Sequence, residues 1–128
     1  MTDASANSIL NLTQHMSTPD QREQGVYDLP PEFRGKVQEL LTFEEIPTQR
    51  DMLDRAFKLA ALSAVLARPD TKEIMIGGAP FFMTILEGSL FAASFKTVYA
   101  FSKREVVESE KDGIVTKNMV FKHIGFVR

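Results

Sequence analysis

The chain has no cysteine and only two histidines, so the common metal and nucleophile motifs are missing. Without cysteine there is no disulfide, no thiol nucleophile and no cysteine-based metal site. The two histidines form neither an HxxxH nor an HExxH pattern, and no GxSxG motif occurs. We therefore predict no metal site and no cofactor.

The chain also lacks an excess of positive charge and a long hydrophobic run. The net charge of −2 argues against coating long nucleic acids, although it permits a locally basic pocket. The longest uncharged run, around Ile74–Leu86, is too short to span a bilayer. The polar start MTDASANS lacks the basic and then apolar pattern of a signal peptide. These features predict a cytoplasmic protein with no membrane partner.

The composition is that of one soluble domain. The 128 residues are 44% hydrophobic and 25% charged, which is ordinary for a globular protein. The small, polar stretch Met1–Asn7 predicts a disordered lead-in. A single domain over residues 8–128 is expected to follow it.

The stretch from residue 73 to 105 has the pattern of a βαβ unit. Glu73–Ile76 is a short β-prone run, Gly77–Gly78 forms a turn, and Pro80 suits the first position of a helix. Phe81–Phe95 is apolar nearly all round, so we expect this helix to be largely covered. A second strand, Thr97–Phe101, should end in a polar, basic run. Ligands of open α/β sheets bind at the edge where such strands end.

The N-terminal part predicts strand, short helix and strand. Ser8–Leu12 is a first strand, and Thr18 with Gln21 forms a capping box for a helix that Gly25 ends. Val26–Leu29 is a second strand. We expect the strand at residues 73–76 to pair in parallel with the first strand, because both are short apolar runs that precede polar or glycine turns.

Two helices should link these strands to the βαβ unit. The apolar positions of Glu32–Phe43 recur at helical spacing. The longest helix, Gln49–Arg68, has Thr48 and Asp51 as a capping pair. After the basic run, Asp112–Gly113 is a hairpin turn.

The hairpin returns in the strand Val115–Val127, with one face formed by Val115, Met119, Phe121, His123 and Val127. The fold class is therefore α/β: a small Rossmann-like, mainly parallel sheet flanked by helices, with a C-terminal antiparallel hairpin.

Three polar stretches are candidates for a common ligand site at the edge of the sheet. They are Asn11, Thr13, Gln14 and His15; Gly77 and Gly78; and Ser102, Lys103 and Arg104. Glycines allow a close approach to backbone amides at a helix start, and adjacent cations suit phosphate. Each stretch also has a structural interpretation: a solvated loop, a tight turn, or a solvated pair of cations on a strand that continues into a hairpin. Lys122 and His123 point to opposite strand faces, and a packed histidine is favoured.

The order of these residues resembles a known family. The series runs from Leu12-Thr13-Gln14-His15 through Thr18-Pro19-Asp20-Gln21 and Gly25-Val26 to Val98–Arg104, Glu108, Asp112-Gly113 and Val120–His123. It is similar to small stand-alone CRISPR-associated proteins with a CARF-like Rossmann fold, the group that includes ring nucleases for cyclic oligoadenylate. The likeness extends from about residue 9 to the end of the chain.

The resemblance implies a metal-independent phosphodiesterase and a homodimer. His15, Lys103 and Arg104 would then be catalytic, and the other candidate residues would bind the cyclic oligonucleotide. The turn at residues 77–81 is more apolar than such a ligand suggests. Two alternatives are a non-catalytic sensor or sponge for a nucleotide-derived signal, and a partner-binding α/β domain with no small-molecule site.

Overall fold

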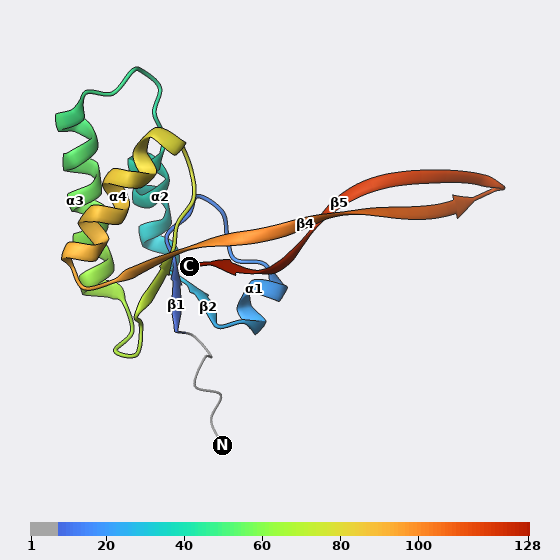
Figure 1. Cartoon of the computed structure of the whole chain (residues 1–128), viewed down its shortest axis with the longest axis horizontal. Coiled ribbons are helices and arrows are strands. Elements are labelled where there is room, and N and C mark those ends of the chain that lie inside the picture. Colours follow the sequence, from blue (N-terminus) through green and yellow to red (C-terminus); the bar gives the residue numbers. More distant parts are fainter. Residues whose placement is uncertain (1–7) are drawn as a thin grey trace.

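A five-stranded sheet, in the order β2-β1-β3-β4-β5, organises the chain. The computed structural model describes residues 8–128, so the predicted lead-in at residues 1–7 lies outside the described part. Strands β1 (Ile9–Asn11), β2 (Val26–Asp28), β3 (Glu73–Met75) and the start of β4 (Lys96–Lys111) are parallel. Strand β5 (Ile114–Val127) is antiparallel to β4. The predicted fold class is confirmed (Figure 1), as is the parallel pairing of β1 with β3.

The helices begin where local chemistry predicts. They are α1 (Pro19–Glu23), α2 (Pro31–Leu41), α3 (Gln49–Leu66) and α4 (Pro80–Ala92). Thr18 and Gln21 form the predicted capping box of α1, and the Thr48 side chain accepts a hydrogen bond from the Asp51 amide at α3. Pro80 occupies the first turn of α4. Gly25 follows α1 with φ of +98°, a conformation that glycine adopts without strain.

The two faces of the sheet are covered unequally. Crossover connections are right-handed, so moving from β1 to β2 places α1 on one face, and moving back toward β3 and β4 places α2, α3 and α4 on the other. On the face covered by α2, α3 and α4, the main core contains Leu10, Ile74 and Phe82. The second face is a smaller cluster of four buried residues, Ile9, Val26, Met75 and Val98, packed against Phe126 of β5. The C-terminal strand therefore covers what α1 leaves open.

Helix α4 is less covered than predicted. Phe82 is fully buried, but Phe81 and Phe91 are 54% and 76% exposed. The helix packs on α3 and on the sheet, and no further described layer lies outside it (Figure 1). The all-round apolar pattern therefore overestimated its burial.

Strand β4 also differs from its prediction. It does not end at Phe101 but continues through Ser102-Lys103-Arg104 to Lys111, because β5 supplies backbone partners along this whole length. Asp112 and Gly113 form the predicted turn, with φ of +54° and +77°. We call residues 102–122 the arm; this part of the hairpin projects from the body (Figure 1), and all its residues are exposed.

A β-bulge shifts the alternation of β5 where the arm meets the body. Gly125 pairs with Phe101, yet His123 pairs with Ser102, which leaves Ile124 as an extra residue. Val115, Met119, Phe121 and His123 share a face as predicted. Val127 pairs with Tyr99 and lies on the opposite face, so its predicted placement was wrong. Within residues 8–128, no helix has the length and apolar character needed to cross a membrane.

The burial of α4 predicts a sharp contrast between two phenylalanines of one helix. Phe82→Ala should lower the free energy of unfolding by about 3–5 kcal/mol, because it removes a fully buried ring and leaves a cavity. Phe91→Ala, at an exposed position, should change it by less than about 0.5 kcal/mol. Urea unfolding followed by circular dichroism measures both. Equal effects would contradict the described packing.

Candidate functional site

The carboxyl ends of β1 and β2 are joined by polar side chains. The register sets Asn11 opposite Asp28, and the Asn11 Nδ2 donates to Asp28 Oδ1 at 2.8 Å and to the His15 carbonyl at 2.7 Å. The Asn11 Oδ1 accepts from the Thr13 amide and hydroxyl at 2.9 and 2.7 Å. These four bonds fill the hydrogen-bonding capacity of a side-chain amide. Asn11 therefore shapes the loop after β1 and has no group left for a ligand.

Asp28 fixes the other end of this loop. Its carboxylate accepts from the Ser17 amide at 3.0 Å and from the Ser17 hydroxyl at 2.9 Å. Burial raises the pKa of Asp28, but the hydrogen bonds from Asn11 and Ser17 and the charge of Arg34 outweigh burial and hold that pKa below its usual 3.8. The loop is thus anchored by an ionised carboxylate.

The glycine turn after β3 lies against this loop. A Cβ added to Gly77 would be 3.8 Å from Thr13 Cγ2, so two of the three predicted stretches meet at the carboxyl edge. Gly78 has φ of +147°, which a residue with a side chain rarely adopts. Among residues 8–128, no recorded hydrogen bond engages the amides of Gly77 and Gly78. These amides precede the N-cap of α4, Ala79, and the absence of side chains lets an anion approach them.

Gln14 and His15 point to different surroundings. Gln14 donates to the Thr42 hydroxyl at 2.9 Å, so its side chain is held against the end of α2. The His15 side chain is exposed, and no recorded hydrogen bond to residues 8–128 occupies its imidazole. The cavity beneath the loop measures only about 10 Å³, room for about one water. This cavity is therefore too small to hold a nucleotide.

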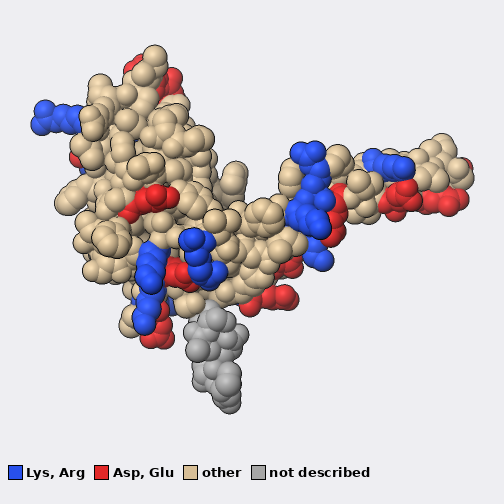
Figure 2. All heavy atoms as spheres, in the orientation of Figure 1, with Lys and Arg blue, Asp and Glu red and all other residues tan. Residues whose placement is uncertain are grey.

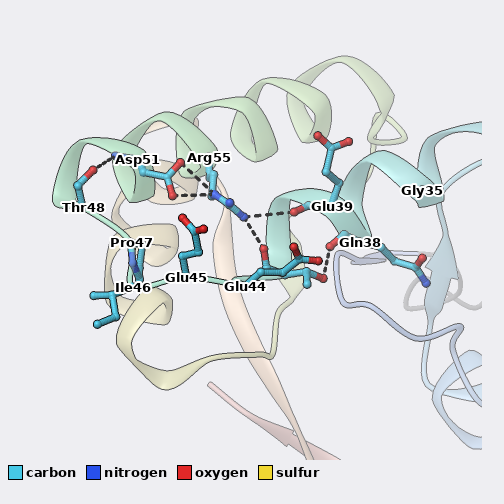
Figure 3. Close-up of a pocket in the computed structure, with 11 residues that line it drawn as sticks. Gly35, Gln38, Glu39, Glu44, Glu45, Ile46, Pro47, Thr48, Asp51 and Arg55 are labelled. Atoms are coloured by element: carbon cyan, nitrogen blue, oxygen red, sulfur yellow. Dashed lines mark hydrogen bonds and ion pairs between the residues drawn. The ribbon is translucent and has the colours of Figure 1, made fainter.

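A larger hollow of about 760 Å³ lies between α2 and α3 (Figure 3). Its central residue, Arg55, donates to both carboxylate oxygens of Asp51 and to the carbonyls of Glu39, Leu40 and Thr42. These bonds satisfy the carbonyl groups at the end of α2. Because the guanidinium is engaged in this way and carboxylates surround it, the hollow is a poor site for phosphate.

The third predicted stretch does not join the other two. Ser102, Lys103 and Arg104 lie within β4 at the base of the arm, opposite His123, Lys122 and Phe121. No hydrogen bond or ion pair recorded within the described chain links them to the loop after β1 or to the glycine turn. Figure 2 shows Lys and Arg side chains gathered where the arm leaves the body. Lys103 directly opposite Lys122 is a like-charge pair, which an anion would relieve.

His123 is packed, as the sequence favoured. It is 9% exposed, its ring meets Phe126 edge-on at 5.0 Å between centroids, and its Nε2 lies 2.8 Å from Gln24 Oε1. Burial lowers its pKa, and the charge of Asp20 opposes this in part. Its role is to fasten β5 to the end of α1. Among residues 8–128, no group of three or more His, Cys, Asp or Glu side chains is placed to hold a metal ion.

Comparison with known proteins gives a family but no activity. A family model described as "Uncharacterized protein MJ1673 family" matches residues 7–127, nearly the whole chain. The chain belongs to this MJ1673 family. Neither a curated protein nor a solved structure matches it.

Sequence reasoning missed Asp28 and Ser17 as parts of this site. Asp28 interrupts an apolar strand at its last position, and β1 ends in a polar residue in the same way. A polar residue at the end of each of two neighbouring parallel strands could have indicated that Asn11 and Asp28 belong to one site. Ser17 gave none, because its partner becomes adjacent only after folding.

The Asp28 network predicts a pH-dependent contribution to stability. Because the folded pKa lies below the unfolded value of 3.8, the ionised carboxylate stabilises the fold above that value, and this stabilisation is lost as the pH falls through the folded pKa. Asp28→Asn should lower the free energy of unfolding by about 1.5–3 kcal/mol at neutral pH. Its stability should also fall less than that of the unchanged protein on acidification. The control is Asp54→Asn, in an exposed pair with Lys58; equal acid sensitivity of Asp28→Asn and the unchanged chain would contradict the assignment.

Proposed function

We propose that the chain binds a cyclic oligoadenylate messenger at its carboxyl edge and cleaves it as a metal-independent ring nuclease. The observation that carries the proposal is the meeting of Thr13 with the Gly77–Gly78 turn, together with the exposed imidazole of His15 two residues further along the same loop. The turn offers backbone amides for a phosphate, and the loop after β1 offers a proton-transfer group.

The chemistry needs positioning and proton transfer. The ribose 2′-oxygen attacks the adjacent phosphorus, the bond from phosphorus to the 5′-oxygen breaks, and a 2′,3′-cyclic phosphate and a 5′-hydroxyl result. His15 takes the proton from the 2′-hydroxyl or gives one to the leaving 5′-oxygen. The amides of Gly77 and Gly78 stabilise charge on the phosphorane.

The cations at the base of the arm have a secondary place in this proposal. Ser102, Lys103 and Arg104 serve a ligand only if the ring extends from the loop after β1 to the arm. The like-charge pair Lys103–Lys122 supports this placement, since a phosphate between the two ammonium groups would neutralise them. Related domains grip symmetric rings across a two-fold axis, so the proposal includes a homodimer in the cytoplasm.

A non-catalytic sensor or sponge is the second candidate. One observation favours it: the cations are not brought to His15 by any recorded contact within the described chain. In such a protein the loop and the turn would hold the ring without in-line geometry, and no cleavage would follow.

Replacing His15 separates the two candidates. His15→Ala should slow single-turnover cleavage of cyclic tetra- or hexa-adenylate by about 10²–10⁴-fold, with binding changed much less, because an acid–base group acts mainly in the transition state. Reactions run in chelator, and direct binding is measured in parallel. The control is Gln14→Ala, which removes a neighbouring side chain held against α2.

Three results would change the proposal. Tight binding without cleavage by the unchanged protein would establish the sensor. Cleavage that needs an added metal would overturn the mechanism. Absence of binding to both rings would leave the partner-binding domain.

A further inference from the structure

One face of the arm carries three exposed apolar side chains that nothing in the described chain covers. Antiparallel partners lie on the same side of a ribbon, so the rows Arg104–Phe121, Val106–Met119 and Glu108–Lys117 form one face. We call these six residues the arm face. Val106, Met119 and Phe121 are 59%, 55% and 70% exposed. The arm face continues the side of β4 that packs as the second face of the body, beginning at Val98.

An isolated ribbon of this kind is a weak structure. Two strands without a third or a packed layer are marginally stable in water, and the arm has no buried residue along its length. Over the same length its opposite face has the rows Lys103–Lys122, Glu105–Val120 and Val107–Asn118, with two valines and no larger apolar side chain. The arm face, which holds Met119 and Phe121, exposes more apolar surface and is the better suited of the two to burial.

We propose that a second copy of this chain covers the arm face, with two arms packed face to face around a two-fold axis at Val106 and Met119. The axis lies midway between the two ribbons and runs perpendicular to their strands. The strands of the second copy therefore run opposite to those of the first. This arrangement sets each Val106 against its counterpart and each Met119 against its counterpart.

The charges favour this arrangement. One row from the centre, Arg104 of one copy meets Glu108 of the other, and Phe121 meets Lys117. Within one chain, the Arg104 guanidinium already lies 5.6 Å from the Phe121 ring and Lys117 lies 3.5 Å from Glu108. Across the axis, the same four residues make two ion pairs and two cation–aromatic contacts per dimer. A self-complementary pattern of this kind is what a two-fold interface requires.

The inference concerns a surface distinct from the ligand loops and does not rest on the proposed activity. Its test uses the full chain without nucleotide, measured by sedimentation at micromolar concentrations. Val106→Asp should raise the dimer dissociation constant by about 100-fold, because two carboxylates would meet at the axis and two apolar side chains would be lost. Val107→Asp, the adjacent residue on the opposite face, is the matched control and should change it less than about threefold.

Charge reversal gives a test that a merely structural effect cannot imitate. Arg104→Glu and Glu108→Arg should each weaken self-association, whereas an equal mixture of the two variants should form a heterodimer, since opposite charges then meet at both contacts. The double variant should self-associate again. Circular dichroism confirms that each body remains folded.

The proposal fails on any of three results. These are a monomer for the unchanged protein at tens of micromolar, a dimer indifferent to Val106→Asp, or charge variants that do not recover on mixing. A dimer through the exposed helix faces would give the second result and would overturn it.

Discussion

The second face of the sheet, which the short helix α1 cannot cover, is the constraint on which the rest of the chain depends. Four buried side chains, from Ile9 to Val98, need a cover, yet α1 has only five residues and none of them is buried. Cover comes from the C-terminus, where Phe126 packs on the cluster and Arg128 bonds to Glu73 of β3 at 2.7 Å. Strand β5 returns there along β4, which runs far beyond the short parallel strands, and the extension of these two strands is the arm.

At the carboxyl edge, the chain separates residues that shape the site from residues that face outward. The carboxylate of Asp28 accepts hydrogen bonds from the side chains of Asn11 and Ser17 and from the Ser17 backbone amide. Because buried polar groups need partners, this network is part of the fold itself. It leaves the His15 side chain exposed and Thr13 against Gly77. The hydrogen bonds that hold the loop thus fix the position of its outward groups in the folded chain.

Local chemistry and the parallel pairing of β1 with β3 were predictable from the sequence, whereas the length of β4 and the side-chain contacts between distant segments were not. Thr18, Thr48 and the Asp112–Gly113 turn act through residues a few positions away, so their patterns carry the full cause. The end of β4 was misjudged because Ser102-Lys103-Arg104 resembles a strand end until β5 pairs with it. The bulge at Ile124 and the Ser17–Asp28 contact likewise depend on partners that only folding brings close. For the same reason the sequence could not show that the loop after β1 meets the Gly77–Gly78 turn, while Ser102-Lys103-Arg104 lies apart from both in β4.

Helix α1 is in contact with both the loop and the arm. On one side Arg22 donates to the Ser17 carbonyl, and Ser17 is held by Asp28. On the other side Gln24 bonds to the Ile124 carbonyl at 3.2 Å and to the His123 ring. The same short helix therefore holds both the loop after β1 and the base of the arm. The short helix, too small to cover the sheet, is thus the physical link between the carboxyl edge and the arm.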